Sequence, residues 1–356
     1  MVTSLKTKEF TLMKNLFYLL SIFLIAFACA YRQPEKQEIR FISRAVKDAK
    51  IAKKLLIIEF WAPECGPCLR LKHDIFENEK NSEFLNKNFV IVKVSPADSV
   101  YKPLWKNYNL EYQSTVIFFD MNGNEIDRTV SYDGNRDTYL NFMKEVSEGV
   151  NLYSVVFSTY NKDTINVNSN YLLAKKLMFR YQIRGAVNHF NKVLLYDKDN
   201  KFRHNPECRF RIAEGEFLLT GNVKKLQEYV KRYLNKDYVP KAYEYLISDL
   251  INKRDQNGCI SLCEEAVSKY PDSYEILNKY AWAICTFRIK EDYGKALDMV
   301  QKSISINPGR AGTYSTEAWI HFEMGDKEKA IQLQNKAIEL YPLSSYMKDL
   351  EKFKSE

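Results

Sequence analysis

Two cysteines placed directly after a long apolar segment are the feature that most constrains the fold of this chain. Residues 55–62 read Leu-Leu-Ile-Ile-Glu-Phe-Trp-Ala, the run stops at Pro63, and Cys65-Gly66-Pro67-Cys68 opens a segment that continues as Leu-Arg-Leu-Lys. A continuous apolar run of this length is typical of a strand buried on both faces, and the segment behind it resumes as a helix. The sequence therefore predicts a buried strand that feeds a helix beginning at the two cysteines.

The segments around this unit alternate between helical and strand patterns. Apolar residues recur at helical spacing over 41–52 and over 139–146, which predicts an opening and a closing helix. Three further strands are expected at 89–94, 115–119 and 126–130, and the hairpin turn signal Asn122-Gly123 joins the last two. We therefore expect an α/β domain with a mixed central sheet flanked by helices.

This arrangement resembles the thioredoxin family. The resemblance rests on Trp61-Ala62, on the Cys65-Gly66-Pro67-Cys68 motif after a hydrophobic strand and on the order of the elements, and it covers residues 36–150. The opening helix and the stretch from Phe76 to Val90 are more similar to the thioredoxin-like domains that serve extracytoplasmic disulfide reduction. The resemblance implies a thiol–disulfide oxidoreductase that needs no cofactor beyond its own dithiol.

Cys65 is the expected nucleophile of this fold, and Cys68 is the expected resolving cysteine. A thiol at a helix N-terminus has a lowered pKa, because unpaired N–H groups and the helix dipole favour the thiolate. Glu59 stands where the thioredoxin pattern has a buried acid, which implies a raised pKa and a role as the base for Cys68. The alternative is an exposed glutamate at a strand edge. Trp61 is expected to be a packing shelf beneath the active site.

Two departures from the family pattern bear on this chemistry. Glu64 stands where an aromatic residue is usual, and its negative charge opposes formation of the thiolate of Cys65. Ser114, followed by Thr115, stands where thioredoxins have a cis-proline that faces the dithiol. A cis bond before a non-proline residue costs about 2.5–4 kcal/mol, so this loop is expected to be trans, or cis under strain. Pairing of the loop with a substrate backbone is therefore in question.

Two other chemistries are compatible with cysteines in this position. Loss of the shielding proline would open Cys65 and Cys68 to a metal, with His73 as a further ligand, but the sequence lacks the second Cys or His pair of a zinc site. A thiol hydrolase needs a histidine beside Cys65, and His73 is expected on the helix surface. We therefore predict neither a bound metal nor hydrolase activity.

The first thirty residues have the composition of an export signal. Lys14 precedes a short apolar run over 16–28, which ends in the small residues Ala28-Cys29-Ala30. Three readings remain open: a signal peptide cleaved after Ala30, a bacterial lipoprotein acylated at Cys29, or an uncleaved anchor, although a comfortable span needs about 20 apolar residues. All three place the rest of the chain outside the cytoplasm, and we expect a periplasmic protein.

Beyond residue 166 the pattern is helical throughout and it repeats. Pro271, Pro308 and Pro342 are 37 and 34 residues apart, and small residues precede each proline by five and by twelve positions. This period resembles the tetratricopeptide repeat, whose helix pairs stack into a solenoid with a concave face. We expect four or five helix pairs over residues 167–350, joined to the first domain by a polar linker at 151–166.

Cysteines and aromatic residues of the repeat region are interpreted as packing residues. Cys259 and Cys263 lie four residues apart and coincide with the small-residue positions, so core packing is preferred over a pair of metal ligands. A minority of the aromatic side chains is expected to line a peptide-binding groove. The net charge of +8 is mild and no dense Lys/Arg block alternates with aromatics, so no nucleic-acid binding is expected.

The sequence leads to two hypotheses about function. The first is an exported thiol–disulfide oxidoreductase, and specifically a reductase, because Gly-Pro between the cysteines accompanies a reducing poise in thioredoxin-like proteins. Its partners would be disulfide-containing protein substrates, a membrane electron donor, and a protein or peptide held by the repeats. The second is a non-catalytic extracytoplasmic scaffold in which the same fold and repeats only bind partners.

Overall fold

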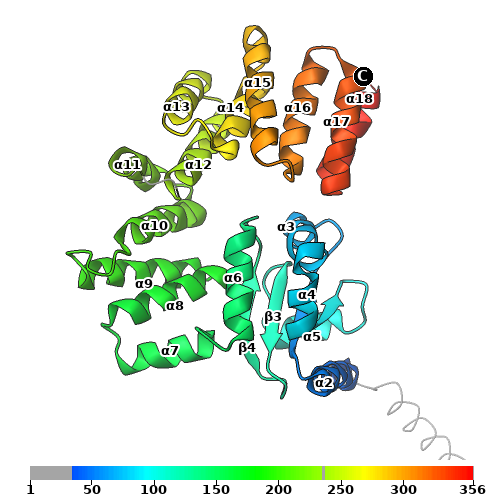
Figure 1. The fold of residues 1–356 in the computed structure, drawn as a ribbon, viewed down its shortest axis with the longest axis vertical. Coiled ribbons are helices and arrows are strands. Elements are labelled where there is room, and N and C mark those ends of the chain that lie inside the picture. The colour runs from blue at the N-terminus through cyan, green and yellow to red at the C-terminus, as the bar shows by residue number, and fades with distance from the viewer. Residues whose placement is uncertain (1–33, 235–236, 356) are drawn as a thin grey trace, which may run out of the picture.

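The computed structural model describes residues 34–234 and 237–355 of the chain. An α/β domain occupies the N-terminal part, and a curved array of helices follows it (Figure 1). The predicted leader at 1–30, with Cys29, lies outside the described residues. Within the part that the structure describes, no helix combines the length and the apolar character needed to cross a membrane.

A four-stranded mixed sheet forms the centre of the N-terminal domain. The strands are β1 (Leu55–Phe60), β2 (Phe89–Val94), β3 (Thr115–Phe119) and β4 (Glu125–Val130). Their spatial order is β2-β1-β3-β4, with β1 parallel to β2 and antiparallel to β3, and β3 antiparallel to β4. The predicted hairpin turns at Gly123, whose φ of 86° suits glycine. The mixed sheet expected from the sequence is thus confirmed.

Helices cover both faces of this sheet. In chain order they are α2 (Pro34–Ala52), α3 (Gly66–Leu71), the π-helical segment η1 (Lys72–Phe76), α4 (Glu79–Asn88), α5 (Tyr101–Asn107) and α6 (Arg136–Ser147). On one face, α2 and α5 pack Ala49 and Leu104 against Ile58. On the other face, α3, η1, α4 and α6 pack side chains such as Leu71 and Phe142 against Ile57. Because both faces are covered, β1 is buried almost throughout, which explains its uninterrupted apolar run.

Helices make up the rest of the described chain. They are α7 (Tyr153–Lys162), α8 (Val167–Phe179), α9 (Ile183–Tyr196), α10 (Asn205–Thr220), α11 (Lys224–Arg232), α12 (Val239–Asn252), α13 (Gln256–Lys269), α14 (Tyr274–Phe287), the short 3₁₀ segment η2 (Lys290–Asp292), α15 (Tyr293–Ile306), α16 (Ala311–Glu323), α17 (Lys327–Leu340) and α18 (Ser344–Ser355). From α8 to α17 they follow one another as five packed pairs along a curve, which brings α17 back towards α3 (Figure 1). The predicted helical solenoid is confirmed.

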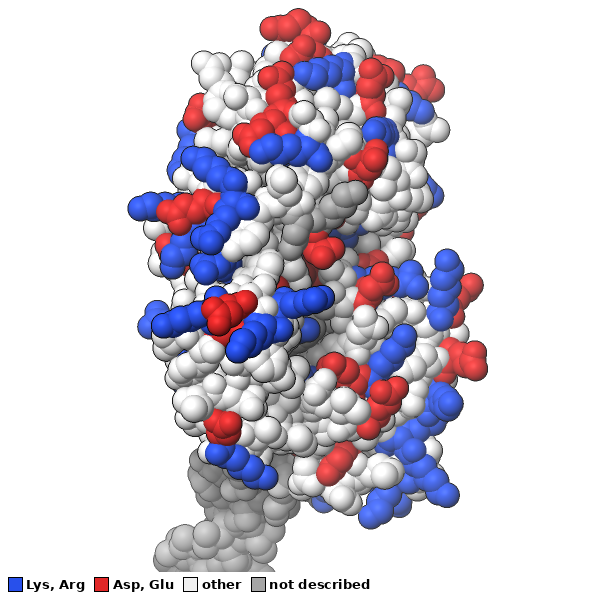
Figure 2. All heavy atoms as spheres, turned by 60° about the vertical axis from the view of Figure 1, so that its left-hand side comes forward, with Lys and Arg blue, Asp and Glu red and all other residues white. Residues whose placement is uncertain are grey.

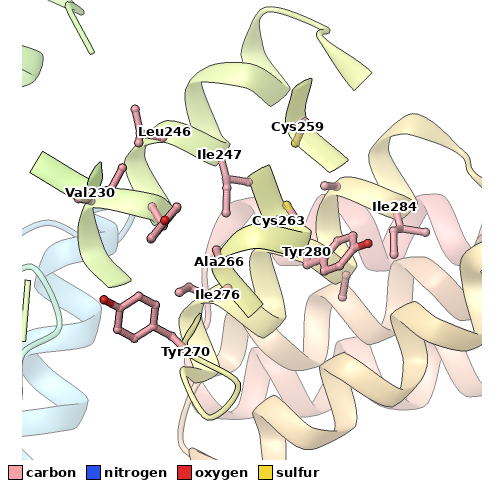
Figure 3. Packing of buried hydrophobic residues seen from close by; sticks show 14 of the residues in the cluster. Val230, Leu246, Ile247, Cys259, Cys263, Ala266, Tyr270, Ile276, Tyr280 and Ile284 are labelled. Atoms are coloured by element: carbon pink, nitrogen blue, oxygen red, sulfur yellow. The ribbon is translucent and has the colours of Figure 1, made fainter. Parts of the chain in front are cut away.

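Small residues are buried where the helices of the solenoid approach one another. The fully buried residues at the repeat positions are Cys259, Ala266, Ala296, Ser303, Ala330 and Ala337. Figure 3 shows Cys263 near Ile247 and Tyr280, within the same hydrophobic cluster as Cys259. The two cysteines are therefore packing residues, as the sequence indicates.

The segment between the two domains differs from the prediction. The sequence predicts a polar linker over 151–166, but the structure has helix α7 there. Tyr153, Val156 and Tyr160 recur at helical spacing and pack into one cluster with residues of α8 and α9, such as Phe190. The polar residues that suggested a linker lie around the end of this helix. Packing against the neighbouring helices therefore outweighs the local polarity.

A buried ion pair fastens the first solenoid helices to the edge of the sheet. Lys176 Nζ of α8 lies 2.8 Å from Asp127 Oδ2 of β4, and both side chains are buried. The same oxygen accepts a hydrogen bond of 3.2 Å from the N–H of Tyr153, and Arg180 Nη1 lies 3.7 Å from Asp127 Oδ1. Burial raises the pKa of Asp127, although Lys176 and Arg180 act in the opposite direction. The carboxylate thus joins β4 to both α7 and α8.

Replacing Lys176 by methionine should therefore destabilise the protein. The Asp127 carboxylate would stay buried without its nearest cation, which costs about 3 kcal/mol, at the lower end for a broken buried pair because Arg180 remains. The double variant Lys176→Met/Asp127→Asn should recover part of this loss, because it removes the uncompensated charge. The free energy of unfolding in urea, followed by circular dichroism, measures both effects.

Lys253→Met is the matched control for this experiment. Lys253 lies 2.7 Å from Asp249, but this pair sits on the surface and its lysine is mostly exposed. Such a pair should contribute less than about 1 kcal/mol. Equal losses of stability in Lys176→Met and Lys253→Met would contradict the role assigned to the buried pair.

Candidate active site

The two cysteines of the motif are joined at the N-terminus of α3. Their sulfurs form a disulfide, and their Cα atoms are 5.2 Å apart. Cys65 Sγ accepts a hydrogen bond of 3.2 Å from the N–H of Cys68. Cys65 is half-buried, whereas Cys68 is only 1% exposed. Cys65 is therefore the cysteine that a partner molecule can reach.

The sequence of the motif explains why a helix begins at this point. Cys65 is the N-cap of α3 and has an extended backbone, with φ of −84° and ψ of 103°. Pro67 lies in the first turn, where a backbone N–H would have had no partner inside the helix. In the reduced protein, the free N–H groups of this turn and the helix dipole favour a thiolate at Cys65.

Glu59 is buried on β1 beneath the helix that carries the cysteines. It is 1% exposed, and because side chains alternate along a strand it shares a face with Ile57, which packs against Leu71 of α3. Lys93 Nζ on the neighbouring strand lies 3.9 Å from Glu59 Oε2, and that oxygen has no hydrogen-bond partner. Burial raises the pKa of Glu59 to about 7, and Lys93 offsets part of the rise. Near neutral pH this carboxyl can take up or release a proton.

The loop at Ser114 is trans and is held by its own backbone. All described peptide bonds are trans, and Ser114 adopts a left-handed conformation with φ of 60°. Its N–H donates to the carbonyl oxygen of Phe60 at 3.0 Å, and its carbonyl oxygen accepts from the N–H of Ser131 at 2.8 Å. Thr115 Oγ1 donates to the carbonyl oxygen of Tyr112 at 2.7 Å. Both backbone groups of Ser114 are therefore engaged inside the protein and are unavailable to a substrate strand.

The charges around the motif differ from what the sequence alone suggests. Glu64 is exposed to solvent, which screens its effect on Cys65. The guanidinium of Arg70 lies close to the motif. Its Nη1 is 3.6 Å from the position that a Cβ would take at Gly66. Arg70 Nη2 also donates to the carbonyl oxygen of Tyr132 at 3.2 Å. Arg70 was not among the predicted site residues, although its position one turn after Gly66 on α3 is a signal for it.

Trp61 is half-buried beside the motif. Its backbone N–H donates to the carbonyl oxygen of Val94 at 3.0 Å, which continues the pairing of β1 with β2 beyond the end of the strand. The chain is thereby held in place just before it turns into the cysteines. The packing role expected of Trp61 beneath the active site stays a prediction.

The last repeat of the solenoid contacts the active-site helix. Tyr341 Oη, after α17, donates to Asp74 Oδ1 of η1 at 2.8 Å, across 267 residues of sequence. The ring of Tyr341 also packs edge-on against His73, with centroids 5.0 Å apart. Leu343 Cδ2 lies 3.6 Å from the position that a Cβ would take at Gly66. The sequence gives no local signal for these contacts, and the end of the solenoid therefore forms one wall of the site.

The described residues offer no arrangement suited to a metal. Among them, no three His, Cys, Asp or Glu side chains are grouped closely enough to hold an ion. His73, the candidate third ligand, instead contacts Asp74 through Nδ1 at 3.0 Å and packs against Tyr341. The site as described is a dithiol with a buried carboxyl beneath it.

Comparison with known families agrees with both parts of the fold. Residues 42–147 match the thioredoxin-like domain, and residues 311–342 match the tetratricopeptide repeat. One curated relative, a TPR repeat-containing protein from Methanocaldococcus jannaschii, is 25% identical over 181 residues, which are 51% of this chain and 27% of that protein. This chain thus spans about a quarter of the length of that relative.

Two of the solved structures that match part of this chain are described as TPR proteins. YrrB, described as a TPR protein with an unusual peptide-binding site, is 12% identical, covers 55% of this chain and 97% of its own, and has a TM-score of 0.38. Yeast Tom70 is 14% identical, covers 57% of this chain and 42% of its own, and has a TM-score of 0.45. From the family matches and the sheet and helices described above, the chain carries a thioredoxin-like domain followed by tetratricopeptide repeats.

Proposed function

We propose that this protein is an exported thiol–disulfide oxidoreductase that works as a reductase on protein substrates. The observation that carries the proposal is the unequal burial of two bonded cysteines at a helix N-terminus, with Cys65 accessible and Cys68 buried. This difference in burial supports Cys65 as the attacking sulfur and Cys68 as the protected, resolving sulfur. A dithiol arranged in this way supports stepwise exchange through a mixed disulfide.

The reaction begins with both cysteines reduced. The Cys65 thiolate attacks one sulfur of a substrate disulfide, so that a bond from Cys65 Sγ to the substrate forms and the substrate S–S bond breaks. The departing substrate thiolate takes a proton from water. Cys68 Sγ then attacks Cys65 Sγ, which forms the intramolecular disulfide and releases the second substrate sulfur as a thiolate. The substrate has gained two electrons, and the Cys65–Cys68 pair is oxidised.

Glu59 is the proposed base of the second step. Cys68 must lose its proton before it can attack, and it is buried away from bulk water. The carboxyl beneath α3, with its pKa raised to about 7 by burial, accepts that proton when it is ionised. It returns the proton to solvent once the disulfide has formed.

The location and the electron donor of this reaction belong to the same proposal. The predicted export signal supports a position outside the cytoplasm, most simply the periplasm. A reductase outside the cytoplasm must be recharged by two electrons from elsewhere. A membrane protein with its own dithiol is a donor of suitable chemistry. The repeats, whose end lies beside the dithiol, would recruit the protein substrate.

Cys68→Ser should trap a substrate as a stable mixed disulfide, because Cys65 can still attack but nothing resolves the bond. Cys65→Ser should abolish turnover and form no adduct. The wild-type pair should show a reversible redox midpoint near −270 mV, the potential of thioredoxin. Alkylation of the folded protein in dithiol buffers measures this midpoint, because the other four described cysteines are buried.

The same measurements separate the reductase from its alternatives. A midpoint near −120 mV would indicate an oxidase, because the reduced form of the pair would then be the stable one. Full disulfide reduction by Cys65→Ser would contradict the proposed nucleophile. Absence of a reversible couple, together with saturable peptide binding, would establish the scaffold hypothesis instead.

Glu59→Gln should make the protein more stable above neutral pH. The folded carboxyl titrates near 7 and the unfolded one near 4.5, so the folded state binds the extra proton between these values. The contribution of Glu59 to the free energy of unfolding of the wild type therefore falls as pH rises from about 4.5 to about 7. The glutamine has no charge to bury, so its advantage should reach on the order of 3 kcal/mol at pH 8 and vanish at pH 4. Urea unfolding at the two pH values measures the difference.

The same variant should slow the second step of the reaction. Stopped-flow release of the substrate thiol should lose its rise with pH around 7 and fall about tenfold or more at pH 8. Glu77→Gln is the control, because Glu77 also neighbours Lys93 but is exposed.

A difference in stability between Glu59→Gln and wild type that did not change with pH would contradict the raised pKa.

A further inference from the structure

A cavity lies between the active-site helix and the concave side of the solenoid. Its volume is about 300 Å³, and it opens to solvent. The N-terminal domain contributes Arg70 of α3 and Asp133 from the loop after β4, whereas the opposite wall comes from α12, α14, α16 and the segment after α17. Since Arg70 also lies next to Gly66, the cavity adjoins the Cys65–Cys68 loop.

Two arginines from different domains line this cavity. Arg310, just before α16, has its Nη1 only 2.6 Å from the position that a Cβ would take at Gly134, so its guanidinium reaches the N-terminal domain. It also lies over the ring of Tyr274, 5.6 Å from the centroid. Burial and then the charge of Arg310 lower the pKa of Arg70, which agrees with a second guanidinium group nearby. Both arginines are half-buried.

Neither arginine has a carboxylate partner within the described residues. No described Asp or Glu oxygen lies within 4.0 Å of the guanidinium nitrogens of Arg70 or Arg310. Burial alone would lower the pKa of Arg310, but nearby groups that include Asp74 and Glu275 raise it overall. These carboxylates act from beyond ion-pair distance. Neither guanidinium is therefore engaged by a carboxylate, whose geometry its planar fork matches.

The remaining polar groups of the cavity limit where an anion can sit. Lys241 is already paired with Glu244 at 2.8 Å, and Glu275 Oε2 accepts from the hydroxyl of Ser273 at 3.0 Å. Glu244 and Glu275 oppose an anion close to α12 and α14, and Asp133, beside Gly134, opposes one close to the loop after β4. An anion is therefore favoured only at contact distance from the two guanidinium groups. Asn278 Oδ1 is buried without a hydrogen-bond partner and can accept an N–H. An acceptor of this kind suits the backbone N–H of a peptide.

The charge of the cavity is a local arrangement. On the face shown in Figure 2, Lys and Arg side chains are interspersed with Asp and Glu over most of the surface. This face therefore has no general attraction for anions. The two arginines instead form a site whose position relative to the dithiol is fixed by both domains.

We propose that this cavity binds a carboxylate of the substrate between Arg70 and Arg310, so that the enzyme prefers disulfides close to an acidic residue in an extended segment. This substrate preference rests on the reductase function proposed above. The carboxylate has two possible sources, an acidic side chain or the C-terminus of a chain. An open cavity beside the dithiol fits the side chain of a segment that continues past Cys65, and we commit to this source.

Three synthetic peptides with one identical disulfide loop test the preference. The first carries Glu two residues from the cystine and has an amidated C-terminus, the second carries Gln instead, and the third carries Gln with a free C-terminus. The full chain should reduce the first peptide with a kcat/KM about tenfold higher than the second, as expected for one charge-assisted hydrogen-bonded pair. A comparable gain for the third peptide alone would assign the site to chain termini and overturn the stated preference.

Arg310→Gln should bring the ratio between the first two peptides close to one, and Arg310→Lys should restore it in part. The redox midpoint of the Cys65–Cys68 pair should stay unchanged, which separates substrate binding from the chemistry of the dithiol. Arg288→Gln is the matched control, because Arg288 is exposed and pairs with Glu323 away from the cavity. Melting temperatures of all variants identify any that fail to fold.

A binding measurement keeps the test decisive if turnover is absent. The same peptides, labelled with a fluorophore, are titrated against Cys65→Ser by fluorescence anisotropy, and the Glu peptide should bind about tenfold more tightly than the Gln peptide. Equal affinities and equal kcat/KM values that Arg310→Gln leaves unchanged would overturn the proposed site but not the reductase. Tight binding of the Glu peptide without any reduction would overturn the reductase but not the carboxylate site.

Discussion

The buried carboxylate of Asp127 determines where the solenoid can begin. Its Oδ2 accepts hydrogen bonds from the ammonium of Lys176 and from the N–H of Tyr153, so α7 and α8 are held against β4. Repeats of a solenoid contact only their neighbours, and their orientation is therefore set from this end. Because the solenoid curves, Tyr341 near its far end contacts Asp74 on η1. Both ends of the solenoid therefore contact the N-terminal domain. Two polar contacts at opposite ends thus place the end of the solenoid beside the dithiol.

The proposed chemistry of the site depends on the burial of β1. Burial of this strand removes Glu59 from water, which raises the pKa of that carboxyl to about 7. The helix that begins at the motif buries Cys68 and leaves Cys65 half-buried. The same packing that stabilises the domain therefore produces the proton acceptor that the proposed reaction requires.

Features encoded over short distances in the sequence were predictable, and those formed by distant segments were not. The buried strand at 55–60, the Asn122-Gly123 hairpin and the repeat period each depend on local patterns, and the structure contains all three. Helix α7 was missed, because its packing on α8 outweighs its polar surroundings. Arg310 and Tyr341 were missed because hundreds of residues separate them from the motif they approach. Only the curvature of the whole solenoid brings these side chains to the dithiol.

The placement of the solenoid gives a physical reason why Ser114 can replace the proline of the family. In this chain both backbone groups of Ser114 are hydrogen-bonded internally, so the loop cannot hold a substrate strand through them. If the protein reduces disulfides as proposed, its substrate must be held by other groups near Cys65, such as Arg70 beside Gly66 and the facing side chains of the last repeats. If recognition has moved from the loop to the solenoid, the dithiol domain without its repeats retains its redox couple but loses its choice of substrate. The repeats are then part of the active site rather than an appended binding module.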